Sequence, residues 1–197
     1  MDRQSNEPKH FLSYLYILVA FASGLATGLQ WARSADTETA PPAVERDQVL
    51  NELRDAINTE YGFLNGGPRI NQGPCPAFAI AFWEEWNRRF NDKASLGVVM
   101  TPTRDFAHHV LVRFADGSAF DGGNGVMSPQ LQALCVADDI LVELKDPNRP
   151  LLEHYFGKLD RKFPRCPDYD EQKTRKIIAK HLDRLLLLRN TPRKGAS

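Results

Sequence analysis

Cys75 stands where a thiol can act as a nucleophile. It lies in the stretch NQGPCP (residues 71–76), directly before an apolar segment that continues to residue 90. Proline favours the first position of a helix, so the sequence predicts a helix that starts at Pro76 and has Cys75 as its N-cap. The unpaired N–H groups and the positive dipole end of such a helix favour a thiolate over a thiol. Cys75 is therefore the candidate nucleophile.

The same turn offers donors for the oxyanion that forms when a thiolate attacks a carbonyl group. Backbone N–H groups at the start of the helix can stabilise this charge. The side chain of Gln72 or Asn71 is a candidate further donor, on the ground of its position alone.

A thiolate enzyme also needs an imidazole that shares the proton and later protonates the leaving group, and a third group that orients the ring. The stretch HVLVRFADGSAFD (109–121) predicts a β-hairpin that turns at Asp116-Gly117. His109 opens its first strand and Asp121 closes its second. These two residues are the candidate base and orienting group.

The turn decides which histidine faces Asp121, since side chains of a strand alternate between its faces. A three-residue loop with glycine in the left-handed region, a G1 bulge, pairs residue 114 with 118 and places His109 and Asp121 on one face. A two-residue turn would bring His108 to that face instead. We predict His109 as the base, with His108 as the alternative.

The surrounding sequence predicts an α+β fold, in which the helix that bears Cys75 packs on a short antiparallel sheet. Apolar residues at helical spacing predict helices, and short β-branched runs predict two strands beside the hairpin. The helices are expected at 46–59, 76–90, 150–156 and 171–189, and the strands at 96–100 and 140–144. Trp83 and Trp86 fall in the apolar stripe of the second helix, so they are expected in the core.

This order of residues resembles that of known thiol enzymes. A cysteine that starts a buried helix, a histidine that opens a strand and an aspartate that ends the next strand occur in this order in papain-like and transglutaminase-like enzymes and in arylamine N-acetyltransferases. The stretches GPCPAFA (73–79) and HVLVRFADGSAFD (109–121) are also similar to small phage- and plasmid-borne proteins with a predicted triad. The resemblance implies a papain-like domain with Cys75, His109 and Asp121 as its catalytic residues. Papain carries its glutamine well upstream of the cysteine, so the resemblance gives no role to Gln72.

A membrane segment is expected before this domain. Residues 11–32 form an uncharged run of 22 residues after a polar segment, 1–10. As a helix, this run would cover the roughly 30 Å hydrocarbon core of a bilayer, so it predicts a single-pass transmembrane helix or signal anchor. A cleaved signal peptide is the alternative, because small residues at 26–28 fit a cleavage site. Arg3 and Lys9 precede the run, while Arg33 and Arg46 follow it with three acidic residues among them. This slight bias favours a domain outside the cytoplasm.

Further features are expected around the membrane segment. Ala20, Gly24 and Gly28 form a small-xxx-small ladder that could pair two such helices in a homodimer. Residues 33–45 indicate a stalk, 46–190 the folded domain and 191–197 a tail.

Charge gives no sign of a nucleic-acid partner, because 25 basic and 25 acidic residues cancel over the chain. Basic residues are in excess from residue 171 onward. The last predicted helix should pack by its apolar stripe, and the alternative is that it lies on an anionic membrane surface. No cofactor is expected.

Each candidate residue also has a structural interpretation. Cysteine is a common core residue, so Cys75 could be a structural thiol. Asp121 could cap the turn DGGNG (121–125) with its own side chain. A metal site from His108, His109 and Asp121 is disfavoured, because adjacent histidines of a strand point to opposite faces. Cys135 and Cys166 are expected as buried thiols or as a disulfide, which would leave Cys75 free.

Two classes of function fit this sequence. The first is a membrane-anchored thiol hydrolase or acyltransferase that acts on an amide or thioester through Cys75, His109 and Asp121. The alternative is a non-catalytic, membrane-tethered binding or exclusion protein with the same fold. The peptide, amide or thioester substrate cannot be chosen from the sequence, because the loops that would select it have no recognisable signature.

Overall fold

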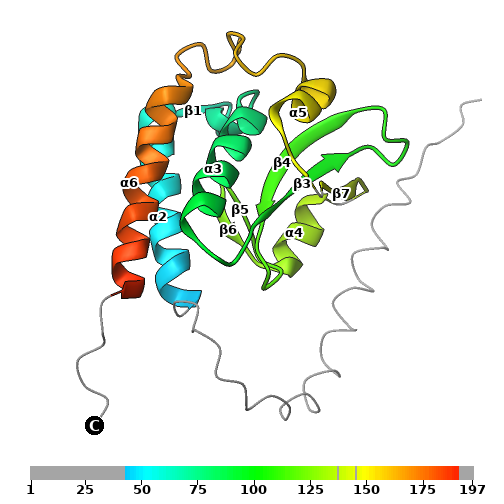
Figure 1. Cartoon of the computed structure of the whole chain (residues 1–197). Helices are drawn as coiled ribbons and strands as arrows, with labels where there is room; N and C mark the ends of the chain where they lie inside the picture. Colours follow the sequence, from blue (N-terminus) through cyan, green and yellow to red (C-terminus); the bar gives the residue numbers. More distant parts are fainter. Residues whose placement is uncertain (1–42, 137, 145, 191–197) are drawn as a thin grey trace, which may run out of the picture. The chain divides into compact units, whose positions relative to one another are not determined.

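The computed structural model describes residues 43–190 except 137 and 145, and it shows an α+β fold with a five-stranded antiparallel sheet (Figure 1). The helices are α2 (Ala43–Tyr61), η1 (Arg69–Asn71, a 3-10 helix), α3 (Cys75–Arg89), α4 (Pro129–Val136), α5 (Arg149–Phe156) and α6 (Glu171–Asn190). The strands are β1 (Phe63–Leu64), β2 (Gly67–Pro68), β3 (Ser95–Met100), β4 (Ala107–Arg113), β5 (Ala119–Asp121), β6 (Gly125–Met127) and β7 (Ile140–Leu144).

The main sheet has the strand order β6-β5-β4-β3-β7, and every neighbouring pair is antiparallel. Strand β4 lies at its centre and pairs with β3 along most of its length, with an irregularity between Val99 and Met100. Its pairing with β5 covers only Val112 with Phe120 and Arg113 with Ala119. The first half of β4 therefore has no described strand partner on its β5 side.

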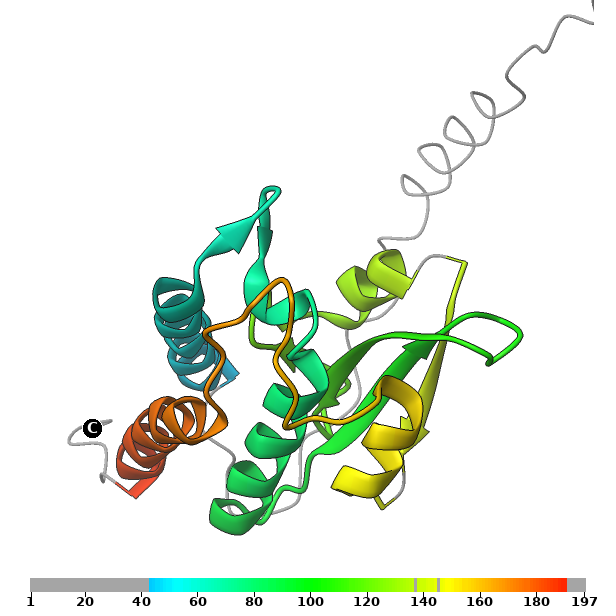
Figure 2. The same ribbon diagram turned by 90° about the horizontal axis from the view of Figure 1, so that it is seen from above.

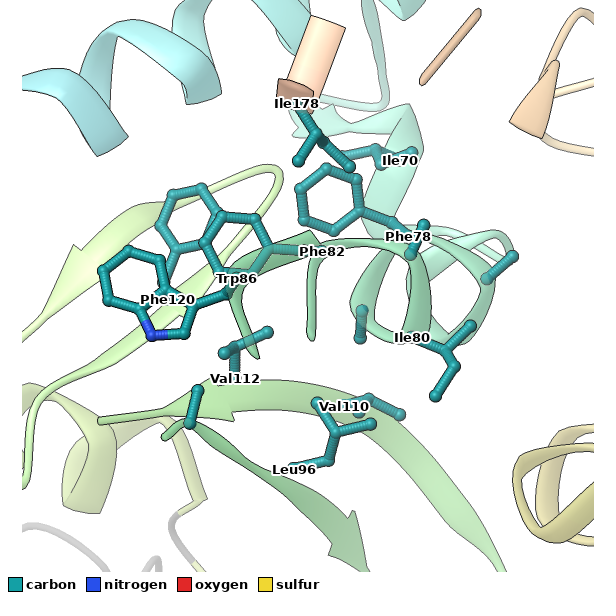
Figure 3. Packing of buried hydrophobic residues seen from close by; sticks show 14 of the residues in the cluster. Ile70, Phe78, Ile80, Phe82, Trp86, Leu96, Val110, Val112, Phe120 and Ile178 are labelled. Atoms are coloured by element: carbon teal, nitrogen blue, oxygen red, sulfur yellow. The ribbon is translucent and has the colours of Figure 1, made fainter. Parts of the chain in front are cut away.

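Helix α3 is the central helix of the fold. Figures 1 and 2 show it between the sheet and the neighbouring helices α2 and α6. Its aromatic residues Phe78, Phe82 and Trp86 are buried against side chains of β4 and β5, among them Val112 and Phe120 (Figure 3). The ring centroids of Phe82 and Phe120 lie 4.9 Å apart. These residues recur at helical spacing in the sequence, so they form one apolar face through which α3 packs on the sheet.

A smaller apolar cluster lies apart from the main core. Val99, Leu111, Ala119 and Met127, from four strands of the sheet, form it together with the partly buried Val136 of α4. These residues alternate with those that face α3, as expected for strands with a side-chain period of two. Both faces of the sheet are therefore apolar near β5.

Helix α6 packs on the domain through its apolar stripe, as predicted. Thr174, Ile178, Leu182 and Leu185 are buried. Its basic residues form ion pairs with acidic residues of the neighbouring segments, such as Arg175 with Glu84. The other such pairs are Lys173–Glu60, Arg184–Glu52 and Arg189–Asp92.

Several expected features are corrected or lie outside the described residues. Helix α2 begins at Ala43 and not at residue 46, while β6, α4, η1 and the small β1–β2 hairpin were not predicted. Within the described part of the chain, no helix is long and apolar enough to cross a bilayer. The predicted membrane segment 11–32, with its dimer ladder Ala20, Gly24 and Gly28, lies outside that part, as do most of the stalk and the tail.

The hairpin turn that sets the register of β4 and β5 depends on Gly117. Gly117 has a φ of +83°, and a Cβ added there would meet no clash, since its nearest neighbour would be Pro129 Cγ at 3.6 Å. The Gly117→Ala variant is therefore expected to lose about 1–2 kcal/mol of unfolding free energy through backbone strain alone. Urea unfolding measures this loss. An unchanged free energy would show that the turn does not need its left-handed residue.

Candidate active site

Cys75 is the first residue of α3, and it is only 5 % exposed. The N-cap is Pro74, with φ −78° and ψ 0°, and its carbonyl accepts the first helical hydrogen bond from Phe78 N at 2.9 Å. The prediction of Cys75 as the N-cap was thus wrong by one residue, because Pro74 already has a near-helical backbone. The thiol still lies in the first turn, where the N–H groups of Cys75 and Ala77 precede the hydrogen-bond ladder.

Asp121 ends β5 and is almost fully buried, with 3 % of its side chain exposed. Its carboxylate makes five hydrogen bonds. Oδ1 accepts from Asn71 Nδ2 (3.0 Å), Gly123 N (2.8 Å) and Asn124 N (2.6 Å), and Oδ2 accepts from His109 Nε2 (3.1 Å) and Asn124 Nδ2 (2.8 Å). A buried carboxylate with this many donors is held in one orientation and in its charged form.

His109 joins Asp121 and Cys75. Its ring donates from Nε2 to Asp121 and makes a second hydrogen bond with the Cys75 side chain. The imidazole therefore interacts with both the thiol side chain and the carboxylate, the two partners that a Cys-His-Asp proton relay requires.

The pKa values of the pair reflect this arrangement. Burial alone would lower the pKa of His109, but the negative charge of Cys75, the hydrogen bonds to Asp121 and Cys75, and the charge of Asp121 outweigh it and raise the pKa to about 10. Burial alone would raise the pKa of Asp121, but the hydrogen bond and charge of His109, with donors from Asn124 and Asn71, lower it to about 2. The imidazolium and carboxylate are thus both charged at neutral pH.

The hairpin register explains why His109 and not His108 meets Asp121. Phe114 N donates to Ser118 O (2.9 Å), and Val112 pairs with Phe120, which is the register that the G1 bulge predicts. His108 lies elsewhere, with its Nε2 3.5 Å from Asp139 and 40 % of its side chain exposed. This geometry favours His109 over the alternative base. No group of ligands suited to a metal ion occurs among the described residues.

Neither side-chain amide before Cys75 is free to stabilise an oxyanion. Gln72 Nε2 donates to Leu64 O (2.7 Å) and Gly67 O (3.2 Å) in the β1–β2 hairpin, and Asn71 Nδ2 donates to Asp121. Both predicted donors are thus engaged elsewhere. The backbone N–H groups of Cys75 and Ala77 remain the candidate oxyanion donors.

Two glycines bring the DGGNG turn against the segment before Cys75. A Cβ on Gly122 would lie 2.9 Å from the ring of Phe78, and one on Gly123 would lie 2.5 Å from Asn71 Nδ2 and 2.7 Å from Pro68 Cβ. Only glycine permits so close an approach. Asp121 also accepts from the N–H groups of its own turn, so its turn-capping interpretation and its contact with His109 both hold.

Sequence reasoning missed Asn71 and Asn124 as partners of Asp121. Asn124 had a local signal, because it lies in the same glycine-rich turn as Asp121, and asparagine and aspartate side chains commonly hydrogen-bond within turns. Asn71 had none, because its contact joins segments 50 residues apart.

The remaining cysteines show no similar surroundings where they are described. Cys166 is a free, buried thiol, and burial together with the charge of Asp168 raises its pKa to about 11. It is therefore not paired with Cys135, whose side chain is outside the described part. A pocket of about 440 Å³ lies beside the hairpin turn, where Arg113, Phe114 and Glu143 line it. None of Cys75, His109 and Asp121 belongs to its lining.

The charge relation between Cys75 and His109 gives a titration prediction. The negative charge of Cys75 is the largest cause that raises the pKa of His109. In Cys75→Ala, the midpoint of His109 titration should therefore fall from about 10 toward its ordinary value of 6.5. NMR of the imidazole Cε1–H signal measures it, with Cys166→Ala as the control. A midpoint that is the same in Cys75→Ala and the wild type would contradict the contact.

The same shifts fix the pH range of the ion pair. A raised His109 pKa contributes stability that is complete below pH 6.5 and is lost as the pH rises through about 10. A lowered Asp121 pKa contributes stability above pH 3.8 that is lost as the pH falls through about 2. The pair is therefore intact across the whole neutral range.

Comparisons with known proteins do not place the chain in a family. No family model, no curated protein and no solved structure matches it.

Proposed function

We propose that this protein is a thiol hydrolase or acyltransferase of papain-like type, with Cys75 as nucleophile, His109 as acid and base, and Asp121 as the group that orients the imidazole. One observation carries the proposal: a histidine ring is hydrogen-bonded on one side to a buried, charged carboxylate and on the other to a thiol at the start of a helix. A structural thiol needs no such partner.

The geometry supports an acyl-transfer mechanism. The thiolate of Cys75 attacks the carbonyl carbon of an amide or thioester and forms a C–S bond, while the carbonyl electrons move to oxygen. The N–H groups of Cys75 and Ala77 stabilise this oxyanion. The imidazolium of His109 then donates its proton to the leaving nitrogen or sulfur as the original bond breaks, which leaves an acyl-thioester on Cys75.

The second half of the reaction reverses these roles. Neutral His109 takes a proton from water or from an acceptor amine or thiol, which attacks the acyl group and releases the Cys75 thiolate. Water as acceptor gives a hydrolase, and an amine or thiol gives a transferase. Asp121 keeps the ring aligned through both steps and does not itself take the proton.

An acyl-enzyme on Cys75 is the product that tests this proposal. The wild-type protein is incubated with 4-nitrophenyl acetate or with an acetyl thioester, quenched in acid and mapped by peptide mass spectrometry. We expect one acetyl group on Cys75, with a burst of 4-nitrophenolate close to one equivalent. Acetylation spread over lysines, with Cys75 unmodified in the folded protein, would overturn the proposal.

A second candidate is the non-catalytic binding protein, which the burial of the site favours. Cys75 is 5 % exposed and the His109 side chain is 20 % exposed, so a substrate needs local opening to reach the sulfur. A binding protein would keep the ion pair for stability alone. It would show no burst with either acyl donor.

A further inference from the structure

Asn71 connects the two halves of the candidate site. Its Nδ2 donates to Asp121 Oδ1 at 3.0 Å. Two of the other residues that donate to this carboxylate, Gly123 and Asn124, belong to the turn that follows Asp121 itself. Asn71 is instead at the end of η1, four positions before Cys75. It is therefore the donor that ties the segment before the nucleophile to the orienting group.

The packing around this amide leaves little freedom. A Cβ on Gly123 would lie 2.5 Å from Asn71 Nδ2 and 2.7 Å from Asn71 Cγ, so the amide is pressed against a glycine backbone. Loss of the amide would leave space directly beside the carboxylate. The segment before Cys75 and the turn after Asp121 are thus fitted to each other through Asn71.

The other end of the amide shows which contact fixes its orientation. Asn71 Oδ1 is buried and has no hydrogen-bond partner among the described residues. A buried acceptor without a donor lowers stability, so another contact must favour this orientation of the amide. The reverse orientation would place two oxygens against each other at Asp121. The carboxylate therefore decides how the amide lies.

We propose that Asn71 is a positioning residue, which holds Asp121 against His109 and keeps the segment before Cys75 in register with the turn that carries the carboxylate. This inference rests on the proposed function. Asn71 does not touch a reacting atom and acts through Asp121. Its donor is one of the causes that lower the pKa of Asp121.

The charged groups near the Asp121 carboxylate determine its titration midpoint. They are His109, which bonds to it directly, and Cys75, which bonds to His109. Arg54 of α2 reaches the end of the same turn at Gly125. These groups are unchanged in Asn71→Ala, so a shift of the Asp121 titration midpoint in that variant reports the missing amide.

Asn58 offers a matched control. It is also an asparagine with a buried Oδ1 that lacks a described partner, and its Nδ2 also donates to this turn, at 2.9 Å. Its acceptor is the carbonyl of Gly123, however, and not the carboxylate. Asn58→Ala thus removes a comparable bond to the same turn without changing the donors of Asp121.

The test compares Asn71→Ala, Asn71→Asp and Asn58→Ala in two measurements. The first is the titration midpoint of the Asp121 carboxyl carbon by NMR. Asn71→Ala should raise it, and Asn71→Asp should raise it further, because two adjacent carboxylates cannot both ionise freely. Asn58→Ala should leave it at the wild-type value. Because this measurement needs no turnover, it tests the positioning role even if the proposed function fails.

The second measurement is acyl transfer from 4-nitrophenyl acetate as a function of pH. We expect Asn71→Ala to lower kcat by about tenfold with KM within about twofold, and the acid limb of the profile to move to higher pH. Asn58→Ala should keep the wild-type profile. Wild-type midpoints and kcat in both Asn71 variants, or equal changes in Asn58→Ala, would overturn the inference. Absence of turnover in the wild type, with the NMR shifts present, would overturn the proposed function and leave the positioning role in place.

Discussion

Replacement of Cys75 by alanine is expected to lower acyl transfer by at least about 1,000-fold. The variant removes the sulfur that carries the acyl group in the proposed mechanism and leaves the chain otherwise intact. Release of 4-nitrophenolate measures the rate. Circular dichroism and urea unfolding establish that the variant is folded.

The control for this variant is Cys166→Ala. Cys166 is the other free thiol in the described part of the chain; it is buried, and the groups that shift its pKa are Asp168, Arg69 and Tyr169. Folded Cys166→Ala should keep the wild-type rate per folded molecule. If Cys75→Ala retained a tenth or more of the activity, the nucleophile would have to be sought elsewhere.

The second large effect is expected at Asp121. Asp121→Ala should lose about 3–5 kcal/mol of unfolding free energy, because it leaves the charge of His109 and four other donors without their acceptor in a buried place. Asp121→Asn should lose less, since it keeps the size and one oxygen. In both variants acyl transfer should fall by at least about 100-fold, because His109 loses its orientation and much of its positive charge.

Asp116 provides the comparison for this prediction. It is an aspartate of the same hairpin that accepts from Ser118 and Arg46, but its side chain is 46 % exposed. Asp116→Ala should lower the unfolding free energy by about 1 kcal/mol and leave the acyl-transfer rate unchanged. If Asp116→Ala lowered the unfolding free energy and the acyl-transfer rate as much as Asp121→Ala, the hairpin would respond equally to the loss of either carboxylate. The special environment of Asp121 would then carry no functional meaning.

The hairpin shows how far local sequence determines the candidate site. The turn around Asp116-Gly117 fixes the register through one left-handed glycine, and the register alone decides that His109 lies toward Asp121. The aromatic period of α3 likewise determined which face meets the sheet. Both are short-range patterns, with a repeat of two or 3.6 residues, so they can be followed without knowledge of the fold.

The features that the sequence did not reveal depend on long-range contacts or on very short elements. Strands β1 and β2 have two residues each, and β6 has three, so none of them shows a period. The bond of Asn71 with Asp121 exists only because η1 packs beside the DGGNG turn. The start of α3 was missed by one residue, because a proline on each side of Cys75 made two start positions similar in sequence.

The most direct test of the central claim is the rate at which iodoacetamide alkylates each cysteine between pH 5 and pH 9, in the wild type, His109→Ala and His108→Ala. We predict that Cys75 is alkylated faster than Cys166 at pH 6. This advantage should be lost in His109→Ala and kept in His108→Ala, because His109 interacts with the sulfur, whereas the His108 ring lies beside Asp139. If Cys75 reacts no faster than Cys166, or if its rate is the same in His109→Ala as in the wild type, the Cys-His-Asp account of this protein is contradicted.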